Sequence, residues 1–65
     1  MSINDLLNNG IEIQGRVEVV RWIDDKENII FKSNEVIWNQ NYDWMDADIK
    51  YMYAISGVGL KIEIE

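Results

Sequence analysis

The sequence predicts one domain over residues 1–65 that is mainly β and belongs to the α+β class. A short N-terminal helix is expected to pack on a curved antiparallel sheet of four or five strands, which can curl into a small open barrel. Apolar and polar residues alternate in stretches such as 11–19 and 60–65, as they do in half-buried strands. Clusters of glycine and polar residues separate these stretches, and residues 3–7 carry an apolar stripe at helical spacing.

A short helix is expected over residues 2–9. Ser2 is a good N-cap and Asp5 follows three residues later, which resembles a capping box with Asp in place of Glu. Gly10 suits the end of the helix because it can adopt a positive φ. A helix this short is unstable alone, so its apolar face must dock on the sheet. The residues on that face are Ile3, Leu6 and Leu7.

The first strand is expected over residues 11–23. Its apolar residues occupy odd-numbered positions as far as Val19, and Val20 and Trp22 then occupy even-numbered positions. A period-two pattern that slips by one residue indicates a bulge or a change of buried face. Gly15 is a second point where this strand can bend. A long, bent first strand suits a curved sheet.

Residues 24–28 are expected to form a polar turn and residues 29–32 a second strand, which together make a hairpin with a loop of about five residues. Residues 34–35 interrupt this pattern, and residues 36–38 continue as an extended segment. The stretch 39–48 fits either a loop or one helical turn, because it mixes amides, acids and large rings without a clear period.

Residues 49–55 alternate as a strand with two largely apolar faces, which suits a central strand or an oligomer contact. Residues 56–59 form a tight connection with two glycines. Residues 60–65 show the cleanest alternation, with apolar residues pointing inward and charged residues outward. The expected core residues are Leu6, Leu7, Ile11, Ile13, Val17, Val19, Ile30, Tyr51, Tyr53, Leu60, Ile62 and Ile64.

The chain contains no histidine and no cysteine. It therefore has no Ser–His or Cys–His pair for nucleophilic catalysis, no disulfide and no thiolate metal site. Gly57 and Gly59 lack the later glycine of a dinucleotide-binding loop. The composition is compatible with acid–base catalysis by a pair of carboxylates. So small a chain, however, has little volume for the cleft that would shift the pKa of one of them. We expect no enzymatic activity, no catalytic residue and no cofactor.

Two clusters of acidic residues raise the question of a hard cation, which prefers several oxygen ligands from one loop. They are Asp24, Asp25 and Glu27 in the first turn and Asp43, Asp46 and Asp48 in the later irregular stretch. Lys26 interrupts the first cluster, and the second lacks the glycine and final glutamate of an EF-hand loop. We therefore expect solvated turns and no bound metal.

The chain carries 12 acidic and 6 basic residues, for a formal net charge of −6. A field of this sign repels nucleic acids and attracts basic protein surfaces, although it also keeps a small domain soluble. Carboxylates at positions i and i+2 of a strand lie about 6.6–6.8 Å apart on one face. Glu63 and Glu65 have this spacing, as do Asp46 and Asp48 if that stretch is extended. A row of such charges can imitate a phosphate backbone.

Three tryptophans and three tyrosines are many large rings for so small a core, so some are expected on the surface. Residues 38–44 combine such rings with amides and an acid. This mixture suits recognition of a partner by a loop, and it equally suits a loop that folds back over an open barrel end. The candidate partner-binding residues are Trp38, Tyr42, Asp43, Trp44, Asp46, Asp48, Glu63 and Glu65.

Three segments carry a resemblance to known proteins, namely residues 3–15, 51–54 and 60–65. They read INDLLNNGIEIQG, YMYA and LKIEIE. These segments resemble short acidic proteins of low-GC Gram-positive bacteria, their prophages and mobile elements, and residues 24–48 lie outside the resemblance. The resemblance implies a small accessory protein that modulates a host or defence protein, and it assigns no role to any residue.

These observations favour a small non-enzymatic interaction protein whose partner is a protein with a basic surface. We expect it to occupy a basic, nucleic-acid-binding groove on a host or defence protein, as a phage or mobile-element modulator or inhibitor. One alternative is a small-ligand-binding homo-oligomer, because domains of this size often gain stability from assembly into a homodimer or a higher oligomer. Another is a single-stranded nucleic-acid binder, which the acidic neighbours of each basic residue disfavour.

No apolar run approaches the ~18 residues needed to cross a bilayer, so we expect no membrane partner. The absence of cysteine gives no indication of an oxidising compartment. A cytoplasmic location is therefore expected.

Overall fold

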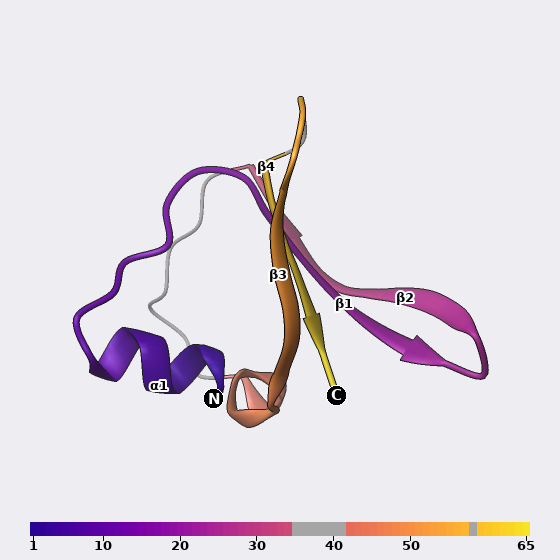
Figure 1. The fold of residues 1–65 in the computed structure, drawn as a ribbon, viewed down its shortest axis with the longest axis horizontal. Coiled ribbons are helices and arrows are strands. Elements are labelled where there is room, and N and C mark those ends of the chain that lie inside the picture. Colours follow the sequence, from indigo (N-terminus) through magenta and orange to yellow (C-terminus); the bar gives the residue numbers. More distant parts are fainter. Residues whose placement is uncertain (35–41, 58) are drawn as a thin grey trace.

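A computed structural model of the chain describes residues 1–34, 42–57 and 59–65. In these residues it contains one α-helix, one 3₁₀ turn and four strands, and Figure 1 labels the helix and the strands. In chain order the elements are α1 (Ile3–Asn8), β1 (Val17–Ile23), β2 (Lys26–Ser33), η1 (Asp43–Asp46), β3 (Ile49–Ile55) and β4 (Gly59–Ile64). The prediction of a mainly β domain, with a short N-terminal helix on a sheet, is confirmed.

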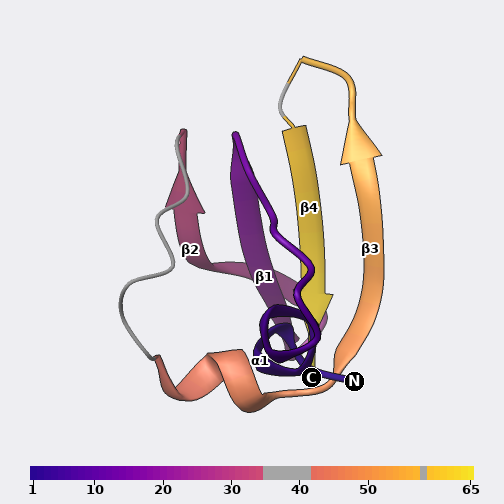
Figure 2. The same ribbon diagram turned by 90° about the vertical axis from the view of Figure 1, so that its left-hand side faces the viewer.

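The four strands form one open sheet in the order β2-β1-β4-β3, seen side by side in Figure 2. The pairs β1–β2 and β3–β4 are antiparallel, whereas the central pair β1–β4 is parallel. The prediction of an antiparallel sheet is therefore wrong at its centre, and the sheet does not close into a barrel. The reason is that the chain forms β3 on the far edge after η1. The returning β4 then enters between β3 and β1 and runs in the direction of β1.

The helix α1 begins with the expected capping box. The Asp5 amide donates a hydrogen bond to Ser2 Oγ at 3.1 Å, and the Ser2 amide donates to Asp5 Oδ2 at 2.9 Å. The bond from the Ser2 amide, and next to it hydrogen bonding by the Ser2 side chain, stabilises the charged carboxylate and holds the pKa of Asp5 below its ordinary value. Ile3 and Leu6 are buried beneath the helix, as the apolar stripe predicts.

The strand β1 begins at Val17, so the prediction that residues 11–16 are extended as part of it is wrong. Gly10 and Gly15 adopt φ values of 80° and 85°, and such left-handed positions interrupt an extended segment. Ile11 is exposed, which contradicts its place in the predicted core. These residues form instead the link that carries the chain from α1 back to the sheet (Figure 1).

The pairing of β1 with β2 shifts between Val19 and Val20, where a bulge is predicted in the first strand. These consecutive residues pair with Phe31 and Ile29, so the extra residue belongs to β2 and not to β1. The hairpin loop is shorter than expected, because only Asp24 and Asp25 lie between the two strands. Both residues adopt positive φ, at 52° and 63°, as the central positions of a type I′ turn require. The strand β2 consequently begins at Lys26, before the predicted position.

The strand β3 has the predicted bounds, Ile49–Ile55, but it lies at an edge of the sheet rather than in its centre. Tyr51 and Tyr53 are 62% and 40% exposed, so their assignment to the core is wrong. They point to the face of the sheet that α1 does not cover. The described part of residues 39–48 contains the turn η1, and the extended segment predicted at 36–38 lies outside the described residues.

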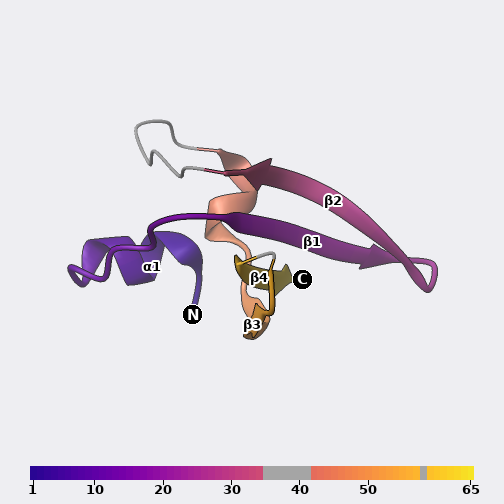
Figure 3. The ribbon, with the colours of Figure 1, turned by 90° about the horizontal axis from the view of Figure 1, so that it is seen from above.

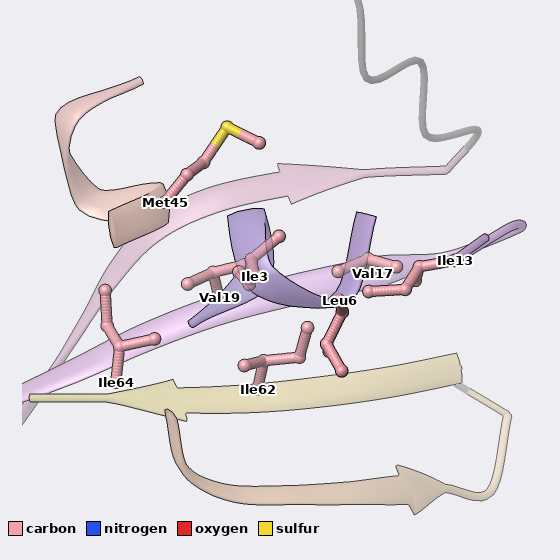
Figure 4. Packing of buried hydrophobic residues seen from close by; sticks show 8 residues of the cluster. All are labelled: Ile3, Leu6, Ile13, Val17, Val19, Met45, Ile62 and Ile64. Atoms are coloured by element: carbon pink, nitrogen blue, oxygen red, sulfur yellow. The ribbon is translucent and has the colours of Figure 1, made fainter. Parts of the chain in front are cut away.

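One hydrophobic cluster fills the space between α1, η1 and one face of the sheet, here called the inner face (Figure 4). It contains Ile3 and Met45, which the predicted core omits. The alternation predicted for β4 is confirmed, since Ile62 and Ile64 are buried in it. The buried residues of the cluster are Ile3, Leu6, Ile13, Val17, Val19, Met45, Ile62 and Ile64. Three further predicted core residues are partly buried against it, namely Leu7, Ile30 and Leu60.

Candidate interaction surface

The face of the sheet that points away from α1, here called the outer face, is covered by no helix in the described part of the chain (Figures 1 and 3). Successive side chains of a strand alternate between the two faces, so the neighbours of the buried inner residues point outward. At the centre of this face Glu18 of β1 pairs with Lys61 of β4, and Val20 pairs with Glu63. The other residues of the outer face are Trp22 of β1, Glu27, Ile29 and Lys32 of β2, and Tyr51 and Tyr53 of β3.

Glu63 connects three strands at the centre of the outer face. Its Oε1 accepts a hydrogen bond from the indole Nε1 of Trp22 at 2.7 Å, and its Oε2 accepts one from the hydroxyl of Tyr53, also at 2.7 Å. Each ring therefore presents its polar edge to the carboxylate and leaves much of its apolar surface in contact with solvent. Because both oxygens are bound, the carboxylate is held in one orientation between the two aromatic side chains.

The hydrogen bond to Glu63 raises the pKa of Tyr53 above its ordinary value, and desolvation and the negative charge of Glu63 act in the same direction. An ionised phenol could not donate this bond, and it would place a second negative charge beside the carboxylate. Tyr53 is therefore a neutral donor at neutral pH, and Glu63 keeps its role as a charged acceptor.

Lys61 is the centre of a second polar cluster on the outer face. Its ammonium donates to both carboxylate oxygens of Glu27 at 2.8 and 2.9 Å and lies 3.8 Å from Glu18 Oε1. The hydrogen bond with Glu27 raises the pKa of Lys61, although desolvation acts against it. Two carboxylates thus compensate one cation, and the charge left over at the centre of the outer face is negative.

Large apolar side chains surround these two polar clusters. Trp22 and Ile29 are 49% and 56% exposed, and Tyr51 is more exposed than either. By contrast, Val20, which pairs with Ile29 and Glu63, is fully buried. Side chains with an apolar face and a polar edge are typical of protein interfaces. The outer face therefore combines exposed rings with fixed carboxylates on a rigid sheet.

The loop predicted as the binding site serves mainly as a packing element where the structure describes it. Trp44 is partly buried against the core, and its ring stacks on Tyr42 with centroids 5.2 Å apart and lies 5.4 Å from the ring of Phe31. Met45, the next residue, is buried in the core. Trp44 and Met45 thus attach η1 to the inner face, while Tyr42 stays exposed. Trp38, another predicted site residue, lies outside the described residues.

The acidic residues of the same loop have separate surroundings. Asp46 accepts a hydrogen bond from Asn4 Nδ2 at 2.6 Å, and Asp48 forms an ion pair of 3.1 Å with the terminal ammonium of Met1. Asp43 is exposed. Asp46 belongs to η1, so the extended arrangement with Asp48 that would imitate two neighbouring phosphates is not formed.

Two predicted site residues on the last strand have different neighbours. Glu65 follows β4, and its amide donates to the carbonyl of Asp48 at 2.9 Å, which brings these two acidic residues together. Glu63 instead accepts hydrogen bonds from Trp22 and Tyr53, which the sequence analysis did not assign to the site. The structure therefore divides the predicted set between the end of the sheet near η1 and the outer face.

A shallow hollow of about 200 Å³ lies where β1 begins and β2 ends. Its lining mixes the cations Arg16 and Lys32 with the carboxylate of Glu18, and Arg16 donates to the carbonyl of Gly57 at 3.1 Å. This mixture of charges selects no class of ligand, so ligand binding stays a prediction. Among the described residues, no three acidic side chains form a group that could hold a metal ion.

Comparisons of the chain with protein-family models, curated proteins and solved structures gave no match. The resemblance to short acidic proteins of Gram-positive bacteria therefore stays an expectation. Within residues 1–34, 42–57 and 59–65, no helix is long and apolar enough to cross a lipid bilayer. The chemistry of the outer face is accordingly the basis for a functional proposal.

Proposed function

We propose that this chain is a non-enzymatic interaction protein that binds a basic surface of a partner protein through its outer face. The observation that carries the proposal is the carboxylate of Glu63, which is fixed between Trp22 and Tyr53 on an uncovered sheet face. An arginine or lysine side chain of the partner is the group that this arrangement suits best.

The carboxylate of Glu63 keeps acceptor capacity for a cation. An ionised carboxylate offers about four lone-pair sites, and the bonds from Trp22 and Tyr53 use two of them. Both donors are neutral, so the negative charge of Glu63 is not cancelled. A guanidinium could therefore bind the remaining lone pairs and also contact the faces of the rings, which attract cations.

The charge of the chain supports a basic partner. With a net charge of −6, the protein attracts positively charged surfaces at long range and repels nucleic acids. A groove that binds nucleic acid on a host or defence protein has the required charge, because it must itself attract phosphates. Occupation of such a groove would make this chain an inhibitor or modulator of its partner.

The rigidity of the outer face also supports this role. Glu63, Lys61 and their partners on neighbouring strands are already connected by hydrogen bonds in the free protein. Side chains that are ordered before binding lose less conformational entropy when a partner arrives. Exposed aromatic rings such as Trp22 are also the side chains that most often dominate the affinity of an interface.

The proposal is tested by comparing two variants that each remove one negative charge. Glu63→Gln removes the charge between the rings, and Asp43→Asn removes one from an exposed position away from the outer face. The tagged proteins are used to capture partners from lysate at low and high salt, and the affinity for each captured basic protein is then measured by calorimetry. Glu63→Gln is expected to weaken binding about tenfold or more, and Asp43→Asn by less than about threefold.

The salt dependence gives a second criterion. Binding that depends on opposite charges weakens as ionic strength rises, because salt screens the attraction. Equal losses in the two variants would mean that only the overall charge matters, and the assignment of Glu63 would then be wrong. A partner with an acidic surface, or an affinity that does not change with salt, would contradict the proposal itself.

A further inference from the structure

The strand β3 forms one edge of the sheet, and its composition differs from that of the other three strands. It reads IKYMYAI, and it is the only one of the four strands without an acidic residue. Lys50 is its single charged side chain. In a molecule with a net charge of −6, β3 is therefore the strand where a second acidic molecule meets the least repulsion.

Exposed apolar side chains lie on both faces of β3. Tyr51 and Tyr53 are exposed on the outer face, and Met52, which pairs with the buried Ile62, is 42% exposed on the inner face. Ala54 is also exposed. A long edge strand of this kind presents unpaired backbone groups together with apolar side chains, which is a template for pairing with another strand.

The opposite edge of the sheet, β2, is protected against such pairing. It carries three charged residues, Lys26, Glu27 and Lys32, whereas β3 carries one. Charged side chains are a usual device that keeps edge strands from associating. Both edge strands have one shift in register, but the shift in β3 lies between Ile49 and Tyr51, at its beginning. The two edges of the same sheet thus differ in charge, and β3 is the less protected of the two.

The beginning of the β3 edge is already occupied. The amide of Ile49 donates to the carbonyl of Met1 at 2.8 Å, and Ser2 forms a bridge with Asp48. The backbone that remains for an additional strand is therefore the segment 50–55, with Met52 near its centre.

We infer that β3 pairs antiparallel with β3 of a second copy of this chain, across a two-fold axis near Met52. In this register Tyr51 lies opposite Tyr53 of the second copy on the outer face, and the two Met52 side chains meet on the inner face. Lys50 lies opposite Ala54 of the second copy, so no like charges face each other directly. The contact is self-complementary, as a closed two-fold dimer requires.

The dimer continues the sheet through eight strands and places two outer faces side by side. This inference does not depend on the proposed binding of a basic partner, and it has the opposite dependence on salt. Two copies that each carry a charge of −6 repel each other, so salt screens the repulsion and strengthens the dimer. Binding of a basic partner would weaken under the same conditions.

The first experiment is sedimentation velocity of the full chain over a concentration series up to about 1 mM, at low and high salt. A monomer–dimer equilibrium that shifts towards the dimer at high salt is the expected result. A monomer throughout the series would overturn the inference, and so would association that weakens as salt is added.

Two matched variants locate the contact. Met52→Lys places a charge at the two-fold axis, where the two lysines would face each other, and Ile29→Lys makes the same kind of change at an exposed apolar residue of β2. Met52→Lys is expected to weaken the dimer about tenfold or more, whereas Ile29→Lys leaves it within about threefold. Circular dichroism of both variants checks that the fold is retained. Equal effects of the two changes would contradict the assignment to β3.

Hydrogen exchange of the unmodified chain locates the dimer contact without any substitution. Amides of residues 50–55 are expected to become more protected as the protein concentration rises, and those of β2 are expected to stay unchanged. Protection that increases along β2 instead, or along neither edge, would overturn the inference even if a dimer were observed.

Discussion

The indole Nε1 of Trp22 donates a 2.7 Å hydrogen bond to Glu63 across the parallel junction of β1 and β4. The two residues are 41 positions apart in the chain. Tyr53 binds the other oxygen of the same carboxylate, so one acidic side chain connects β1, β4 and β3. Changes at Glu63 should therefore be visible in the titration of a neighbouring residue as well as in partner binding.

Glu63→Gln is expected to lower the pKa of Tyr53 towards its ordinary value near 10, because the charged acceptor is removed. In the native protein the raised pKa means that the Tyr53–Glu63 contact stabilises the fold below pH 10 and is lost as pH rises through the folded pKa. The measurement is the absorbance of ionised tyrosine during a titration to alkaline pH.

The Tyr53 titration is identified with Tyr53→Phe, which should remove the step that belongs to this residue from the absorbance curve. Asp43→Asn has the same change in net charge and should leave that step where it is in the native protein. If the two charge-removing variants gave the same curve, the contact between Tyr53 and Glu63 would not be present in solution.

Ser2→Ala is expected to destabilise the protein by about 1 kcal/mol, because the side-chain acceptor of the N-cap is lost. The pKa of Asp5 is lowered in the folded state, so its contribution is present above its ordinary pKa of 3.8 and is lost as pH falls through the folded value. Urea unfolding at a series of pH values should show this loss in the native chain and a smaller one in Ser2→Ala. Ser56→Ala, at an exposed loop position, is the control and should change neither quantity.

The elements that the sequence predicts well are those with strong local patterns. The capping box of Ser2 and Asp5, the bounds of β3 and the alternation in β4 all depend on residues that are close in the chain. The two-residue turn at Asp24 and Asp25 was mistaken for a longer loop, because aspartate in a left-handed conformation gives no periodic signal.

The arrangement of the strands depends on contacts that no local pattern contains. The slip in the alternation places Trp22 on the face opposite Val17 and Val19, but only the parallel pairing of β1 with β4 places it beside Glu63. Tyr51 and Tyr53 have the alternation of a buried strand, and they are exposed because β3 is at the edge. The candidate site could therefore not be assembled from the sequence, although Glu63 was among its predicted members.

Met45→Ala is expected to cost about 2–5 kcal/mol, since the side chain is buried in the cluster that joins η1 to the inner face. The neighbouring Trp44 should become more exposed, so its fluorescence in the folded state should shift to longer wavelength. Met52→Ala removes the same side chain from an exposed position and should cost less than about 1 kcal/mol. Chemical denaturation followed by fluorescence measures both, and similar losses would contradict the packing of η1.

Gly59→Ala tests the point where β4 begins beside the chain that enters β1. Gly59 has a φ of 115°, and a Cβ built there would lie 2.5 Å from the carbonyl oxygen of Arg16, which accepts a 3.0 Å hydrogen bond from Leu60. The added methyl group must displace this backbone contact, so a loss of at least about 3 kcal/mol is expected in denaturant unfolding.

The matched control for Gly59→Ala is Gly10→Ala, because Gly10 also has a positive φ, at 80°, but among the described residues no atom beyond its chain neighbours lies within 4 Å of the added Cβ. It should cost only the backbone strain of a left-handed alanine, about 1 kcal/mol. The difference between the two variants thus measures how closely the chain before β1 approaches β4. Equal losses would mean that the parallel junction tolerates a side chain at Gly59. The close contact between Arg16 and the start of β4 would then be absent in solution.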